Sequence, residues 1–243
     1  MILRATVLAL ILLGMTFAEP CVKADTLSFS SPNTRQVIQR NASNQADLRV
    51  VGSWSGTGVR LEARAVVMDG ATNNGVSTDW VVIVNAPTNG AFIGVLPNVA
   101  AGGWYRVEVR SVDADANLLI SASVDRIGVG DILVTAGQSN AGGFGAPNQT
   151  PTDDRVSSYI LATKRWQFGK DAQPDNSGGM GSGGSPWPIL GSLLTASNHV
   201  PVGFVGVAYG GSALSQWVPG TSFFQTLTNA LRAFGTNGVR AVL

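Results

Sequence analysis

Short runs of alternating apolar and polar residues, or of apolar residues alone, dominate the chain from residue 25 to about residue 126. They lie at 46–51, 59–68, 80–84, 92–96, 104–112 and 118–124, with turn-forming residues at 73–75, 88–90 and 101–103. Alternation with period two is typical of strands whose two faces differ. Runs of this length and spacing predict an all-β antiparallel sandwich of the immunoglobulin or fibronectin kind over residues 25–126.

In two of the runs, the alternation assigns individual residues to the two faces of the predicted strand. In 59–68, one face carries Val59, Leu61, Ala63 and Ala65. In 104–112, one face carries Tyr105, Val107, Val109 and Ser111, and the other carries Trp104, Arg106, Glu108 and Arg110.

The pattern changes near residue 127, where continuous apolar runs replace the alternating ones. The runs 131–136 and 202–208 are typical of strands covered on both faces, and 239–243 begins a third. Helices are predicted at 186–197, which has Pro in its first turn, and at 222–234, which is amphipathic. This order of strands and helices predicts a parallel α/β sheet over residues 127–243.

Between these elements, the segment 169–185 is rich in Gly, Ser, Asp and Pro. We expect it to form an exposed loop near a site. The last predicted strand reaches residue 243 without a helix after it, which leaves one face of that strand bare. We therefore expect the chain to be part of a longer protein.

The N-terminus predicts a secretory signal peptide over residues 1–24. One positive charge at Arg4 precedes an uncharged apolar run at 5–18, and cleavage is expected after Ala24, with Ala18 as a second option. A buried N-terminal helix is the alternative, but neither a polar face nor a cap accompanies the run. We expect a secreted or periplasmic protein with no integral membrane segment after cleavage. Cys21 is the only cysteine, so cleavage after Ala24 would exclude disulfides and cysteine zinc sites.

The charge composition argues against two classes of binding partner. The sixteen Lys and Arg residues are balanced by fifteen Asp and Glu residues, and charged residues make up only 13% of the chain. Because association with nucleic acid or anionic membranes depends on excess positive charge, we expect neither as a partner.

The strongest chemical signal is Gly137-Gln138-Ser139-Asn140, directly after the predicted buried strand 131–136. Ligands of parallel α/β sheets bind beyond the carboxyl ends of the strands, so a serine placed there is accessible to substrate. Gly, Ser and Asn are also ordinary in turns, and position alone does not separate the two interpretations. A second Gly- and Ser-containing turn, at 210–212, follows the strand 202–208. We expect Ser139 and Gly211 to lie side by side at the same edge of the sheet.

The run GQSNAGG after VGDILVTA resembles the first sequence block of the SGNH hydrolases, in the branch of sialate O-acetylesterase-like and acetylxylan-esterase-like carbohydrate esterases. The run VAYGGSALSQW at 207–217 is similar to a second block of that branch. The resemblance covers the chain from residue 127 and implies a partial SGNH (flavodoxin-like) sheet. It also implies Ser139 as nucleophile, the backbone N–H groups of Ser139 and Gly211 as oxyanion hole, and no cofactor or metal. The substrate implied is an O-acetylated carbohydrate, contacted by Gln138, Asn140, Gly210 and Ser212.

Two parts of the family pattern are absent from the chain. A third block, Trp-x-Gln-Gly-Glu, and the catalytic Asp and His would follow residue 243. His199, the only histidine, is expected to be an exposed turn residue without a catalytic role. A serine without a base is a poor nucleophile, so we expect this chain alone to be inactive. The alternative is a non-catalytic secreted carbohydrate-binding or adhesion module.

Weaker candidates remain. Asp113, Asp115 and Asn117 have the spacing of the start of a calcium loop but lack the Gly and Glu that follow in an EF-hand, so we expect a hairpin turn. Asp153 and Asp154 are expected to cap a turn or helix rather than bind metal. Trp54, Trp80 and Trp104 are expected mostly in the core, with a sugar-binding platform as the alternative.

Overall fold

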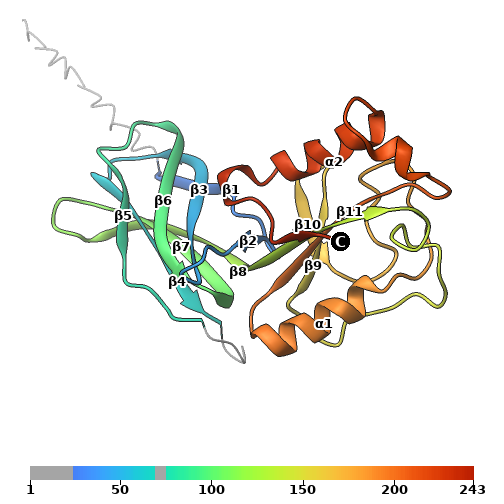
Figure 1. The fold of residues 1–243 in the computed structure, drawn as a ribbon. Coiled ribbons are helices and arrows are strands. Elements are labelled where there is room, and N and C mark those ends of the chain that lie inside the picture. Colours follow the sequence, from blue (N-terminus) through green and yellow to red (C-terminus); the bar gives the residue numbers. More distant parts are fainter. Residues whose placement is uncertain (1–23, 69–74) are drawn as a thin grey trace, which may run out of the picture.

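The computed structural model describes residues 24–68 and 75–243, and Figure 1 shows a β-sandwich on the left joined to a sheet with helices on the right. The signal peptide expected at 1–24, with Cys21, and most of the turn expected at 73–75 lie outside the described residues. None of the described helices is both long and apolar enough to cross a membrane.

Two sheets organise the described residues. The smaller has the order β1 (Thr26–Ser31), β3 (Gln45–Ser55), β6 (Gly90–Ala100), and it is antiparallel. The larger has the order β10 (Arg165–Phe168), β9 (Val156–Ile160), β11 (Val202–Ala208), β8 (Leu118–Gly137), β7 (Gly102–Val112), β4 (Arg60–Val67), β5 (Val81–Asn85). In addition, β2 (Val37–Gln39) and β12 (Ala241–Val242) pair with β8.

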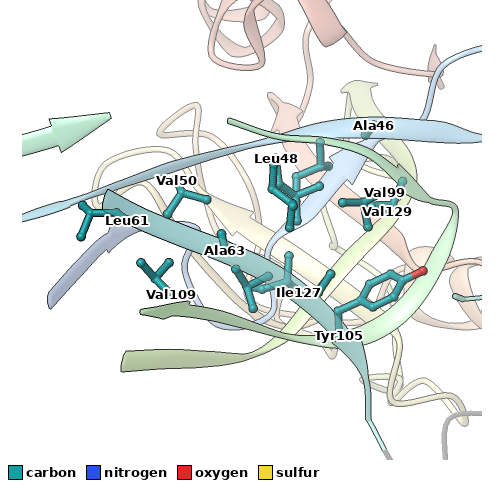
Figure 2. Close-up of a cluster of buried hydrophobic side chains, with 14 of the residues drawn as sticks. Ala46, Leu48, Val50, Leu61, Ala63, Val99, Tyr105, Val109, Ile127 and Val129 are labelled. Atoms are coloured by element: carbon teal, nitrogen blue, oxygen red, sulfur yellow. The ribbon is translucent and has the colours of Figure 1, made fainter. Parts of the chain in front are cut away.

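The sandwich core lies between the smaller sheet and the left-hand part of the larger one. Figure 2 shows Leu48 and Val50 from β3 meeting Leu61, Ala63 and Val109 from the facing sheet. The predicted inner face of β4 is confirmed for Leu61, Ala63 and Ala65, which are buried. The prediction was wrong for Val59, which is 43% exposed because it precedes the strand. On β7, the predicted face of Tyr105, Val107, Val109 and Ser111 is buried throughout.

Strand β8 belongs to both parts of the molecule. The sequence predicts separate strands at 118–124 and 131–136, and this was wrong, because residues 118–137 form one strand. Its first half pairs antiparallel with β7, and its second half pairs in parallel with β11 and β12. The change of pattern near Ile127 marks the point where the strand becomes covered on both faces. Figure 1 shows β8 crossing from the sandwich to the helical part.

Helices cover both faces of the right-hand sheet (Figure 1). α1 (Trp187–Asn198) packs on the face that carries Leu133 and Phe204, and α2 (Ser222–Arg232) packs on the face that carries Val134. Both helices lie close to their predicted ranges, and Ala241–Val242 confirms the third predicted strand. Two short 3₁₀ turns, η1 (Leu214–Trp217) and η2 (Gly235–Asn237), flank α2.

The larger sheet is mixed rather than wholly parallel. The strands β9, β11, β8 and β12 run in parallel, and β10 adds an antiparallel edge. The hairpin of β9 and β10 was not predicted, because Ser157 and Ser158 interrupt the apolar pattern of β9. Both serines are buried, and Ser158 donates a hydrogen bond of 2.6 Å to Gln173.

The parallel pairing of β9, β11, β8 and β12 gives the α/β core that the sequence predicts. The more specific flavodoxin-like arrangement stays a prediction.

Ion pairs tie the sandwich side to the helical side where β8 crosses. The buried Asp131 carboxylate accepts hydrogen bonds from Arg40, at 3.0 and 2.8 Å, and from Arg240, at 2.9 Å. Burial opposes ionisation of Asp131, but the hydrogen bonds from the two arginines outweigh it and lower the pKa of the carboxyl group. Close packing also marks this point, since a Cβ on Gly130 would lie 1.9 Å from the carbonyl oxygen of Pro201.

Candidate active site

The two predicted site segments leave the sheet at the same edge. Strands β8 and β11 are adjacent and parallel, and their last residues, Gly137 and Ala208, are in register. The N–H of Tyr209 then donates to the carbonyl oxygen of Gly137 at 2.9 Å. Ser139 follows two residues after the end of β8, and Gly211 three residues after the end of β11. The topology thus places both at the carboxyl edge of neighbouring strands, as the spacing of the buried strands predicts.

Ser139 lies in a tight turn. Gly137, with φ of +140°, begins the turn in a conformation that favours glycine, and the N–H of Gly142 donates to the carbonyl oxygens of Gln138 (2.9 Å) and Ser139 (3.1 Å). The Ser139 side chain is half-buried, and Gln138 and Asn140 are exposed. Neither the hydroxyl nor the N–H of Ser139 has a hydrogen-bond partner among the residues that the structure describes.

Gly211 presents a second free donor at this edge. It has φ of +72°, it is exposed, and no heavy atom lies within 4 Å of the position that a Cβ would take. Its N–H has no acceptor within residues 24–68 and 75–243. Unlike Gly211, its two chain neighbours have hydrogen-bond partners. The Gly210 N–H donates to the carbonyl oxygen of Gly179 at 3.2 Å, and the Ser212 hydroxyl accepts from Trp217 Nε1 at 3.0 Å. Gly210 and Ser212 therefore hold the turn that presents Gly211.

An aromatic cluster of Tyr209, Trp217 and Phe223 packs beside this turn. The rings of Tyr209 and Phe223 stack with centroids 3.8 Å apart, and Trp217 packs on both rings at 6.3 and 5.4 Å. The amphipathic pattern at 222–234 predicts the helix that carries Phe223 but indicates no role for Tyr209. The helical spacing of Phe223 gives no sign that its ring faces a residue of the preceding turn.

The segment 169–185 lies beside the site, as expected, but it is more buried than an exposed loop. The Ser177 hydroxyl donates to the carbonyl oxygen of Ala208 at 2.6 Å, and the Tyr209 hydroxyl donates to the carbonyl oxygen of Ser177. Asp175 Oδ1 accepts from the N–H groups of Ser177 and Gly178 at 3.0 and 2.7 Å. Burial opposes ionisation of Asp175, yet these hydrogen bonds outweigh it and lower the pKa of its carboxyl group. The segment is thereby fastened to the end of β11.

A second carboxylate in this segment fixes residues around a hollow that Asn140 lines. Asp171 is buried and accepts hydrogen bonds from the N–H of Gln149 (3.0 Å), and from the N–H (2.8 Å) and hydroxyl (2.6 Å) of Ser185. Gln149 and Ser185 line a hollow of about 380 Å³, together with Asn140 and Pro147. No local pattern in the sequence reveals Asp171, because its carboxylate connects its own loop to the distant loop that carries Gln149.

His199 lies at the opposite end of the sheet. It caps α1 at its C-terminus with φ of +56°, it is exposed, and its N–H donates to Thr195 at 2.9 Å. The chain then enters β11, whose seven residues span about 20 Å before the edge that carries Gly211. The expectation of an exposed turn residue is confirmed. Since His199 is the only histidine in the chain, no histidine side chain of this chain lies beside Ser139.

The weaker candidates have structural roles. Asp113 Oδ1 accepts from the N–H groups of Asp115 and Asn117 in the hairpin turn between β7 and β8. Asp153 pairs with Arg155 at 2.8 Å, and Asp154 pairs with Arg35 at 2.9 Å. Within the described ranges, no group of three or more potential ligands from His, Cys, Asp and Glu is placed to hold a metal ion.

The three tryptophans of the sandwich part differ in burial. Trp54 and Trp104 are buried, and Trp104 Nε1 donates to Asp154 at 2.9 Å. Trp80 is only half-buried. Core packing is thus confirmed for the first two, and Trp80 keeps part of its surface in contact with solvent.

Three comparisons relate the chain to known proteins. Residues 129–243 match the model of a family described as carbohydrate esterase, sialic acid-specific acetylesterase. A search of curated proteins found no match. Among solved structures, a novel carbohydrate acetylesterase from Xanthomonas citri is 20% identical, with a TM-score of 0.41, over 80% of this chain and 43% of its own length.

Two further solved structures are similar over shorter stretches. An Arabidopsis thaliana protein is 16% identical, with a TM-score of 0.36, over 46% of this chain and 54% of its own. Fibronectin(III)-like modules of Clostridium thermocellum CbhA are 15% identical, with a TM-score of 0.28, over 43% of this chain and 96% of theirs. Of the Xanthomonas citri protein, this chain spans less than half the length, namely 43%.

Proposed function

We propose that the chain is part of a serine esterase that removes O-acetyl groups from carbohydrates, because residues 129–243 match the family model of the sialic acid-specific acetylesterases. The family resemblance expected from the two sequence blocks is confirmed by this match. The proposal assigns the nucleophile to Ser139 and the oxyanion hole to the N–H groups of Ser139 and Gly211. It includes secretion through the signal peptide expected at 1–24.

The observation that carries the proposal is the pair of unpartnered N–H groups at one sheet edge. Ester hydrolysis passes through a tetrahedral intermediate with a negatively charged oxygen, which needs hydrogen-bond donors that are not already used. The Ser139 and Gly211 N–H groups are free within the described part of the chain, and Gly211 has no side chain to obstruct an approaching ester. Each such donor typically lowers the barrier by about 2.7–4 kcal/mol.

The reaction proceeds in two steps. The Ser139 Oγ attacks the acetyl carbonyl carbon and gives its proton to a base, and the bond from that carbon to the sugar oxygen then breaks. The sugar leaves as an alcohol after it takes up a proton, and the acetyl group remains on Ser139. Water then attacks the acetyl-serine, which releases acetate and restores the hydroxyl.

The described part of the chain places no histidine beside Ser139 to act as the base of this mechanism. His199 is separated from the Ser139 edge by the length of β11, and the Ser139 hydroxyl has no described hydrogen-bond partner. Serine is weakly nucleophilic without a base beside it, so we propose that this chain alone turns over slowly or not at all. Gln138 and Asn140 are exposed beside Ser139 and remain the predicted substrate contacts.

Chemical rescue with imidazole tests this proposal on the chain itself. Hydrolysis of an aryl acetate is measured for the wild-type chain and the Ser139→Ala variant over a range of imidazole concentrations. Imidazole alone cleaves aryl esters equally in both samples, so only the difference between them reports on Ser139. We expect the wild-type chain to exceed the variant by about tenfold at high imidazole, because a general base contributes about 10²–10⁴-fold when it is well placed.

Two further variants sharpen the test. Gly211→Val should remove most of the difference, because a branched side chain at φ of +72° displaces the N–H group. His199→Ala should leave all rates unchanged. Equal rates for the wild-type chain and Ser139→Ala at every imidazole concentration would refute Ser139 as nucleophile and favour a carbohydrate-binding module without catalysis. Imidazole-independent activity that disappears in His199→Ala would refute the assignment of the base to another group.

A further inference from the structure

The outer face of the β-sandwich carries a ladder of charged side chains far along the sequence from Ser139. On β4 and β7, Arg64 lies opposite Glu108, and Glu62 lies opposite Arg110. Arg64 Nε donates to Glu108 at 2.7 Å, and Arg110 Nε donates to Glu62 at 2.8 Å. Arg64 uses only this one N–H within the described residues, so its two terminal nitrogens remain available to a ligand.

Trp80 lies over this ladder, just before β5. The guanidinium carbons of Arg64 and Arg110 are 4.5 and 4.2 Å from the centroid of its ring, which fixes the indole by cation–π contact. Trp80 differs from the buried Trp54 and from Trp104, whose Nε1 donates to Asp154. Trp80 is half-buried, and its Nε1–H has no acceptor among the described residues.

A hollow of about 330 Å³ opens beside the Trp80 ring. Apolar surface comes from Trp80 and from Leu118, which is 59% exposed although it is a large aliphatic residue. Polar groups come from Arg64, Arg110, Glu108, Ser121 and Ser123. Ser121 and Ser123 are exposed, and their hydroxyl groups make no hydrogen bond to any described residue.

We propose that this hollow is a second carbohydrate site, which binds a saccharide unit that carries a carboxylate. A sugar ring needs apolar surface for its C–H groups and several hydrogen-bonding groups for its hydroxyls. The Trp80 and Leu118 side chains supply the first, and the Trp80 N–H and the two serine hydroxyls supply the second. The volume suits one or two sugar rings, and the site does not depend on Ser139.

The charge of the lining selects an acidic sugar over a neutral one. Arg64 pairs with Glu108, whereas Arg110 shares the Glu62 carboxylate with Arg60, at 2.7 Å for each pair. Three arginines thus face two carboxylates, and one positive charge remains in excess beside the hollow. The terminal nitrogens of Arg64 are oriented by its bond to Glu108, and a guanidinium fork suits a carboxylate. A carboxylated sugar supplies the missing negative charge.

The test is a titration followed by ¹H–¹⁵N NMR, in which the indole signal of Trp80 is identified from its loss in Trp80→Phe. The probes are the α-1,4-linked galacturonic acid trisaccharide and the neutral galactose trisaccharide with the same linkage. We expect the acidic sugar to shift the Trp80 signal in a saturable way. The neutral sugar should bind at least about tenfold more weakly, because it has no carboxylate for the guanidinium of Arg64. Arg64→Gln should weaken binding of the acidic sugar by about tenfold, because it removes that guanidinium.

Arg106→Gln is the matched control, because Arg106 lies on β7, next to the strand of Arg64, and pairs with Asp125 at 2.6 Å but does not line the hollow. It should leave the affinity within about twofold. Ser139→Ala should also leave it unchanged, which separates this site from the proposed esterase site. The proposal is overturned if the Trp80 signal does not shift, if both sugars bind equally, or if Arg106→Gln weakens binding as much as Arg64→Gln. A shift that Ser139→Ala abolishes would overturn it as well, because the sugar would then bind at the esterase site.

Discussion

Replacing Asp131 with asparagine removes the negative charge at the point where β8 passes from the sandwich to the parallel sheet. The Asp131 side chain is 5% exposed, that of Arg40 is 16% exposed, and that of Arg240 is 46% exposed. In Asp131→Asn, the Arg40 guanidinium keeps its charge in a site with little access to water. Breaking such a buried pair costs about 3–5 kcal/mol of unfolding free energy. We expect about 3 kcal/mol, because Arg40 retains some contact with solvent.

The assay is urea unfolding followed by tryptophan fluorescence and by circular dichroism. Arg240→Ala is the matched control, since its partner is the same carboxylate but its own side chain is largely solvated. We expect Arg240→Ala to lose less than about 1 kcal/mol, as exposed ion pairs do. Combining Arg40→Ala with Asp131→Asn should cost less than the sum of the two single changes, because each removes the same interaction.

The pH dependence supplies an independent test. The pKa of Asp131 is lowered in the folded protein, because the hydrogen bonds from its arginine partners outweigh burial. Its contribution to stability is therefore complete above the ordinary pKa of an aspartic acid, about 3.9, and is lost as the pH falls through the lower folded value. The gap between the wild-type chain and Asp131→Asn should be constant from pH 7 to about pH 5 and should narrow below about pH 4. A loss below about 1 kcal/mol at pH 7, or a gap that does not narrow in acid, would refute this reasoning.

Three further changes test packing elsewhere by the same unfolding assay. Gly130→Ala should destabilise the protein by about 1–3 kcal/mol, because its Cβ would lie 1.9 Å from the Pro201 carbonyl oxygen, and an unchanged midpoint would contradict the close approach. Leu61→Ala should cost about 2–5 kcal/mol, since Leu61 is fully buried in the sandwich core, and a smaller loss would mean that the core closes around the cavity. His199→Gly should raise stability by about 1 kcal/mol, because an exposed residue at φ of +56° then has no Cβ to strain, and a fall in stability would reveal an unseen contact of the imidazole.

Much of the architecture follows from local patterns in the sequence. Short runs between turn residues predict β3, β5 and β6. Alternation with period two predicts the strands β4 and β7, because a strand with one buried face needs every second residue to be apolar. The continuous apolar runs predict the central strands β8 and β11 for the same reason, applied to two buried faces. The positions of Ser139 and Gly211 after those runs predict their shared edge, because parallel strands end on the same side of a sheet.

Tertiary structure alone decided how these pieces combine. The sequence pattern divides β8 in two, because the change from one covered face to two resembles a break, whereas the backbone continues as one strand through Gly128 to Gly130. The strand β9 is apolar only in part, and its buried serines depend on distant partners such as Gln173. Asp131, Asp171 and Trp80 acquire their roles from residues as many as 109 positions away. Local periodicity reports which face of an element is covered, and it carries no information about which distant side chain covers it.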